Sequence, residues 1–310
     1  MSASGVSRSR IIAAFAAIYL IWGSTYLGIR FAIETIPPFL MGGVRFMIAG
    51  AVLYLWARSR AGEKTSPIHW RSTAIVGACL ILGGNGAVVW AEQFVPSGMA
   101  ALLAAILPFW IVVVEWAGPT RRRPSLGIAI GLVVGIVGII VLVGPSAIHP
   151  SAAAGGGILK GALALMMGSL LWAVGSIYSR HAPLPKSALL ATAMEMLCGG
   201  ALLVALAIIT GEHKQFDLAN VSARSLAGFA YLTSIGSLVG FTAYIWLLTV
   251  QPASRISTHA YVNPVVAVFL GWAIAGEQLN IRTVIAAAII VGAVALITTA
   301  RSSSPVPEPG

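Results

Sequence analysis

Long apolar runs constrain this chain more than any other feature of its sequence. A helix needs about 20 residues to cross a hydrocarbon core about 30 Å thick, and the chain divides into ten apolar runs of about that length. The runs cover residues 11–30, 38–57, 72–91, 97–116, 125–143, 158–179, 187–209, 225–248, 254–275 and 281–300. We therefore predict an all-α membrane protein with ten transmembrane helices, with nine or eleven spans as the alternative.

The composition excludes a water-soluble fold. Only 9% of the 310 residues are charged and 58% are hydrophobic, whereas a soluble domain has about 25% charged residues. There are 19 Lys and Arg residues against 9 Asp and Glu. In a membrane protein such an excess collects in cytoplasmic loops, so it predicts a lipid bilayer as partner and no binding of nucleic acid.

The distribution of basic residues predicts the orientation of the chain. If the N-terminus is cytoplasmic, 13 basic residues lie in cytoplasmic segments and 5 lie on the opposite side. Both termini are therefore expected in the cytoplasm. The first run is longer than the apolar core of a signal peptide, so we expect it to remain as a span.

The chain matches itself at two offsets. At 150 residues, Trp22 pairs with Trp172 and Arg30 with Arg180. At 156 residues, the pairs are Trp90 with Trp246, Pro96 with Pro252, Pro108 with Pro264, and Trp116 with Trp272. Five spans per half is an odd number, so the second copy must be inverted. We predict two inverted five-helix repeats, residues 1–149 and 150–310, with a transport site between them. A symmetric scaffold without transport is the alternative.

Four stretches resemble the EamA branch of the drug/metabolite transporter superfamily. They are residues 21–26 (IWGSTY), 44–50 (VRFMIAG), 101–108 and 263–277. The resemblance implies a secondary transporter that exports amino acids, including aromatic ones, and related metabolites across the bacterial inner membrane. The chain departs from the family at Gly118-Pro119, where a Gly-Glu pair like Gly276-Glu277 is common, so a role for glutamate is in doubt at that end.

Polar and aromatic side chains inside the runs are candidates for lining a substrate site, because polar groups in hydrocarbon are costly. Aromatic rings hold an ammonium group or stack on a side chain without a fixed charge. The predicted substrate-binding residues are Trp22, Tyr26, Asn85, Trp110, Trp172, Ser176, Tyr244, His259 and Asn263. Two roles are considered for His259: a group that couples transport to protons, or a hydrogen-bonded residue in the wall of the substrate cavity.

Four further residues are candidates for gates or hinges. Pro108 and Pro264 hold equivalent places in the fourth and ninth runs, and each predicts a bend, because proline removes a backbone donor. Helix packing alone is the alternative reading. Arg45 and Glu195 are also equivalent and are expected near opposite surfaces, with a structural or a gating role.

No sequence pattern points to an enzyme, a cofactor or a metal. A phosphate-binding loop, a His-Glu-x-x-His pair and a Ser/His/Asp set are all missing from the sequence. Gly131, Gly135 and Gly138 predict close helix packing, within a monomer or across a homodimer. The alternatives to amino-acid export are a channel, export of drugs or other metabolites, and an intramembrane enzyme on lipid-linked substrates. The enzyme needs clustered carboxylates, and the nine acids are scattered along the sequence.

Overall fold

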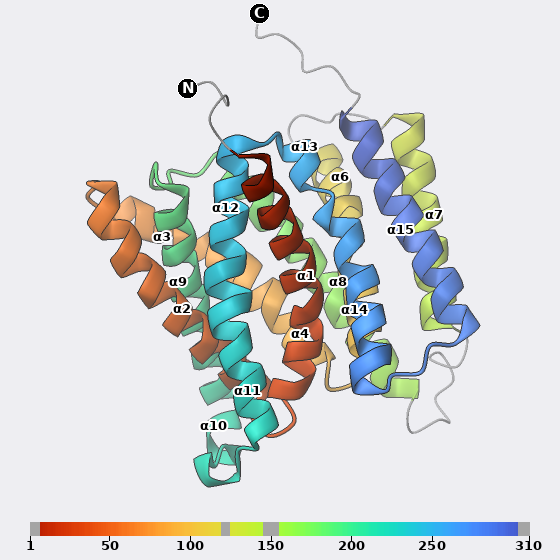
Figure 1. Cartoon of the computed structure of the whole chain (residues 1–310), viewed down its shortest axis with the longest axis horizontal. Coiled ribbons are helices and arrows are strands. Elements are labelled where there is room, and N and C mark those ends of the chain that lie inside the picture. The colour runs from red at the N-terminus through yellow and green to blue at the C-terminus, as the bar shows by residue number, and fades with distance from the viewer. Residues whose placement is uncertain (1–6, 119–124, 145–154, 303–310) are drawn as a thin grey trace, which may run out of the picture.

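The computed structural model describes residues 7–118, 125–144 and 155–302, and these fold into helices that run back and forth between two faces (Figure 1). The first five crossings are α1 (Arg8–Ala32); α2 (Pro38–Ala61); α3 (Pro67–Gly77), η1 (Ala78–Asn85) and α4 (Gly86–Ala91); α5 (Ser97–Ala104) and α6 (Leu107–Ala117); and α7 (Leu126–Val143). The second five are α8 (Gly155–Ser179); α9 (Ala188–Ile209); α11 (Ala223–Tyr231), η4 (Leu232–Val239) and α12 (Gly240–Val250); α13 (Ala253–Ile256) and α14 (His259–Ala275); and α15 (Ile281–Ser302). Two short helices, α10 (Glu212–Gln215) and η3 (Leu218–Asn220), connect α9 to α11.

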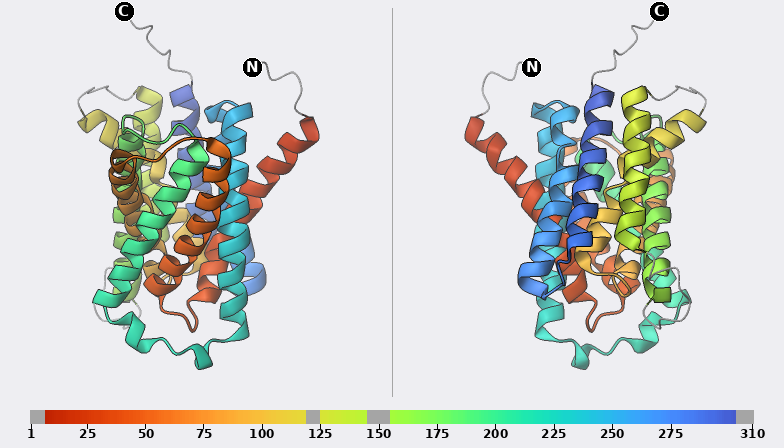
Figure 2. Two further views of the ribbon diagram at one scale, coloured as in Figure 1. Left: turned by 90° about the vertical axis from the view of Figure 1, so that its left-hand side faces the viewer. Right: turned by 90° about the vertical axis from the view of Figure 1, so that its right-hand side faces the viewer.

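The predicted fold class is confirmed. In the described residues, nine helical stretches are long and apolar enough to cross a membrane, and the 17-residue α14 is a shorter apolar helix that completes ten crossings. The start of α1 and the end of α15 lie at the same face of the molecule (Figures 1 and 2). Large apolar side chains such as Ile209 and Ile281 are exposed on the outside, where lipid replaces water as the solvent.

Several crossings are not regular α-helices. The third and the eighth each contain a π-helix of 8 residues, η1 and η4, in which the backbone hydrogen bonds span one more residue than in an α-helix. The third crossing also begins at Pro67, five residues earlier than predicted. Ser66 and His69 form a capping box there, and proline fits the first turn of a helix, so the polar-looking segment 67–71 is helical.

The largest helix contact joins α2 to α9 and depends on glycine. A Cβ atom on Gly43 would lie 2.8 Å from the backbone nitrogen of Val204, and one on Gly200 would lie 2.9 Å from the carbonyl oxygen of Gly43. Small residues let two membrane helices approach to backbone contact. On the far side of the molecule, Gly131 and Gly138 of α7 pack against α15 of the same chain (Figure 2).

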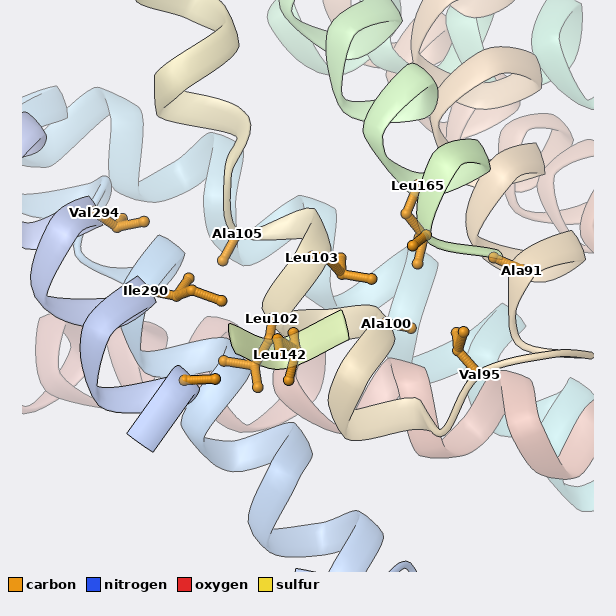
Figure 3. Packing of buried hydrophobic residues seen from close by; sticks show 12 residues of the cluster. Ala91, Val95, Ala100, Leu102, Leu103, Ala105, Leu142, Leu165, Ile290 and Val294 are labelled. Carbon is orange, nitrogen blue, oxygen red and sulfur yellow. The ribbon is translucent and has the colours of Figure 1, made fainter. Parts of the chain in front are cut away.

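A buried apolar cluster fills the space between the fourth crossing and its neighbours. Leu102 and Leu103 of α5 are fully buried there, between Leu165 of α8 and Ile290 of α15 (Figure 3). Side chains from five crossings therefore meet on one short helix, α5, and fix its position.

Carboxylates tie the beginnings of α2 and α9 to the other half of the chain. Glu63, after α2, accepts a hydrogen bond from the backbone N–H of Lys186, at 3.0 Å, before α9. Glu212, after α9, accepts one from the N–H of Leu40 in α2, at 2.9 Å. This reciprocity supports the inverted repeat. The division into residues 1–149 and 150–310 stays a prediction, and its boundary lies outside the described residues.

We expect Gly43→Ala to destabilise the protein by about 1–3 kcal/mol, because backbone rather than a flexible side chain must move to admit the new methyl group. The matched control is Gly292→Ala in α15, where nothing lies within 4 Å of the added Cβ. That change should stabilise its helix by up to about 1 kcal/mol. Thermal unfolding of both variants in detergent checks this, and equal stabilities would contradict the close α2–α9 contact.

Candidate functional site

Three of the predicted substrate-binding residues meet in one aromatic cluster. The Trp22 ring of α1 lies 5.1 Å from the Tyr244 ring of α12 and 5.3 Å from the His259 ring of α14, measured between centroids. The Tyr244 and His259 rings are 5.9 Å apart, and Phe241 lies 5.3 Å from Trp22. The first, eighth and ninth crossings therefore converge on Trp22.

The Trp22 side chain packs against the π-helix η4 and the start of α12. The indole Nε1 donates to the carbonyl oxygen of Gly236 in η4, at 3.3 Å. A Cβ on Gly240 would stand 2.6 Å from the same nitrogen, so only glycine leaves room for the ring. Because π-helices are frequent at functional sites, this contact marks the eighth crossing as part of the site.

Trp172 occupies the matching place in the other half. It lies on α8 and packs against Gly84 of η1, where a Cβ would be 2.4 Å from the indole ring. Trp22 and Trp172 each precede an arginine, Arg30 or Arg180, by eight residues. At 1.5 Å per residue this is about 12 Å along the helix, which is close to half the thickness of a core about 30 Å thick.

Asn263 and His259 are both held by backbone carbonyl oxygens. With its amide nitrogen turned toward them, Asn263 donates to the carbonyls of Tyr19 and His259, each at 3.2 Å. His259 Nδ1 is hydrogen-bonded to the carbonyl of Ile256 at 2.8 Å. The hydroxyl of Tyr19 is hydrogen-bonded to Thr258 between α13 and α14. Nδ1 of His259 is therefore used in a backbone hydrogen bond, and Nε2 is its other polar atom.

The remaining candidate lining residues lie elsewhere. Asn85 donates to the carbonyl of Leu80 in its own helix, at 3.3 Å, and Tyr26 packs against the apolar cluster around α5. Ser176 is half-buried one turn beyond Trp172 on α8. Trp110 on α6 has a buried indole nitrogen with no hydrogen-bond partner in the described part of the chain.

The two prolines do not produce equivalent bends. Pro108 lies in the first turn of α6, directly after an interruption at residues 105–106, because it cannot donate to the carbonyl that would continue α5. Pro264 lies inside a continuous α14, and the ninth crossing is interrupted six residues earlier, at residues 257–258. A gating role for either proline stays a prediction.

Arg45 and Glu195 are the second pair of candidate gating residues, and they have different neighbours. Arg45 is buried, donates to Ser237 of η4 at 3.0 Å, and lies 4.6 Å over the Phe46 ring. At Glu195 the backbone of α9 packs against Gly77. No ion pair joins Arg45 to Glu195 within residues 7–118, 125–144 and 155–302.

Two apolar grooves open on the outer surface, away from the aromatic cluster. One, of about 520 Å³, lies between α1 and α14 and includes Ser24 and Tyr231. The other, of about 530 Å³, lies between α2 and the eighth crossing and includes Trp56 and Trp246. Neither is lined by a predicted substrate-binding residue, and both present apolar side chains to the lipid.

Each end of the molecule carries an ion pair between the halves, which the sequence reading missed. Arg30, after Trp22 on α1, lies 3.4 Å from Glu277 beyond α14. Arg180, after α8, lies 2.7 Å from Glu115 on α6. The match of Arg30 with Arg180 in the repeat was the available signal, but it gave no information about their partners.

Comparisons with known proteins identify the family. The model of the EamA-like transporter family matches residues 9–144 and 159–299. The chain is 37% identical to the uncharacterized inner membrane transporter YedA of Escherichia coli (strain K12), over 94% of this chain and 91% of YedA. It is 25% identical to the uncharacterized transporter YoaV of Bacillus subtilis, over 91% and 94% of the two chains.

A solved structure, titled only as the crystal structure of a protein, has the same fold. Its TM-score is 0.61 at 23% identity, and the match covers 96% of this chain and all of that one. Ten membrane crossings, interrupted helices around an aromatic cluster, and a family match over both halves lead to one conclusion. The chain belongs to the EamA-like transporter family.

Proposed function

We propose that this transporter exports amino acids, including aromatic ones, and related small metabolites across the bacterial inner membrane by alternating access. The observation that carries the proposal is the cluster of Trp22, Tyr244 and His259, which we expect near the membrane midplane. Sites of secondary transporters lie at that depth, between the two halves. YedA is itself named an inner membrane transporter, which supports the same location for this chain.

The chemistry of the cluster suits a small zwitterion with an apolar or aromatic side chain. The faces of Trp22 and Tyr244 attract an ammonium group by about 0.5–2 kcal/mol and offset-stack with an aromatic ring. The second polar atom of His259, Nε2, offers a hydrogen bond to a polar group of the substrate. Contacts of this kind accept several amino acids, because neither shape nor fixed charge selects one of them.

The ion pairs at the two ends suit alternating access. Arg30 and Glu277 connect the first and ninth crossings, and Arg180 and Glu115 connect the sixth and fourth. Ion pairs that reach solvent contribute only about 0–1 kcal/mol, so the Arg180–Glu115 pair can open at low cost. The Glu277 side chain is only 9% exposed, so the Arg30–Glu277 pair costs more to separate. Opening one end while the other stays paired would expose the aromatic cluster to one side at a time.

We expect Trp22→Ala to slow counterflow of labelled phenylalanine in proteoliposomes about tenfold, which corresponds to a loss of about 1.4 kcal/mol in ring contacts. The matched control is Trp272→Ala on α14, because that ring is 51% exposed on the outer surface. Its counterflow rate should equal that of the wild type. Equal losses in both variants would contradict a site at Trp22, and transport of cationic drugs alone would favour drug export.

Single cysteines test whether water reaches the aromatic cluster. After Cys79 and Cys198 are replaced, Tyr244→Cys and Asn263→Cys should react with a small hydrophilic thiol reagent, and substrate should slow the reaction. Phe269→Cys on α14 is the control, since this position is 57% exposed on the outer face and should react only with a lipid-soluble reagent. If neither cysteine in the cluster reacts with the hydrophilic reagent, the cluster is closed to water and the substrate site lies elsewhere.

Both termini are proposed to face the cytoplasm. A reporter fused after residue 310 and one inserted in the 144–157 connection should then give opposite signals, because five crossings separate them. Matching signals would contradict this orientation together with the inverted repeat.

A further inference from the structure

Glu92 is a buried carboxyl group that the transport site does not use. It follows the last residue of α4, it is 5% exposed, and neither of its side-chain oxygens has a hydrogen-bond partner among the described residues. An ionised carboxylate in such surroundings is very costly, and a buried group of this kind neutralises instead. Burial without a hydrogen-bond partner therefore favours the protonated form of Glu92.

The charges around Glu92 come from three other crossings. Arg30 and the Tyr26 phenol lie on α1, and Glu277 lies beyond α14; all three are within electrostatic reach of Glu92. Lys160 of α8, which packs beside the same turn, is exposed. The acids are scattered along the sequence, but folding brings Glu92 and Glu277 into the neighbourhood of Arg30.

Glu277 already uses the available donors. Its Oε1 accepts from the backbone N–H and the hydroxyl of Ser97, both at 2.8 Å, and its Oε2 accepts from the N–H of Gly98 at 3.1 Å. These donors begin α5, where the helix dipole favours a negative charge. Glu277 thus has three hydrogen-bond donors and an ion pair with Arg30. One cation beside two carboxyl groups is neutral only when one carboxyl is protonated.

We propose that Glu92 is a proton-binding site whose proton exchanges when the Arg30–Glu277 end of the transporter opens. When the ion pair separates, Arg30 becomes available to Glu92. The O–H bond of Glu92 then breaks, its electron pair stays on the carboxylate beside Arg30, and the proton passes to water at that face. Closing reverses each step. The link to opening rests on the alternating access proposed above, whereas proton binding does not.

The Glu92 position has no carboxyl counterpart in the second repeat. At the repeat offset of 156 residues, which pairs Trp90 with Trp246, the counterpart of Glu92 is Leu248. In the part of the chain that the structure describes, Glu92 is the carboxyl group whose buried oxygens have no hydrogen-bond partner. Because the proton leaves and returns at the same face, its exchange makes the opening of that end depend on the pH at that face and moves no proton across the membrane.

Infrared spectroscopy of the purified protein tests proton binding without any substrate. At neutral pH the wild type should show a C=O stretching band of a protonated carboxylic acid that shifts in D₂O, and Glu92→Gln should lose that component. Glu34→Gln is the control, because Glu34 sits at the same face in an exposed ion pair with Arg224 and should leave the band unchanged. An unchanged band in Glu92→Gln would overturn the proposal.

Proteoliposomes test the coupling. Glu92→Gln should retain phenylalanine counterflow and lose the dependence of its rate on the pH at the Arg30–Glu277 face, Glu92→Asp should retain that dependence, and Glu34→Gln should behave as the wild type in both respects. A wild-type pH dependence in Glu92→Gln would overturn the coupling. Thermal unfolding confirms that each variant is folded. If phenylalanine is not a substrate at all, the infrared result still decides whether Glu92 binds a proton.

Discussion

In a bilayer every backbone N–H and C=O must find its partner inside the protein, and this constraint shapes the whole molecule. The chain satisfies it with helices, and irregular backbone also occurs within the third, fourth, eighth and ninth crossings. There, side chains from neighbouring helices supply the missing partners. Trp22 donates to a carbonyl of the π-helix η4, and Asn263 donates to the carbonyls of Tyr19 and His259. The aromatic cluster is therefore also the device that stabilises the interrupted crossings.

Glycine makes this arrangement possible. Gly240 and Gly84 admit the rings of Trp22 and Trp172 against the two π-helices, and Gly43 brings α2 to backbone contact with α9. The tight α2–α9 pair contrasts with the two ends, where ion pairs with partly exposed arginines join the halves. A close α2–α9 contact, together with ion pairs at the two ends, is an arrangement that supports rocking of one half against the other.

Carboxylates at the ends have two kinds of surroundings. Glu63, Glu212 and Glu277 each accept backbone N–H groups near the start of a helix, where the dipole stabilises a negative charge. Glu92 is buried without such donors. Three of these acids therefore hold the scaffold, and the fourth is left to exchange a proton.

The sequence by itself determined the number of crossings and the family, because apolar run length and rare residue types are local properties of the chain. It also proposed Trp22, Tyr244 and His259 as site candidates, although not that their rings touch. Only the tertiary structure decided where crossings are interrupted and that Glu92 is buried within electrostatic reach of Arg30 and Glu277. Contacts between distant crossings depend on helix tilt and on the fit of neighbouring surfaces, and no periodicity in the sequence encodes either of these.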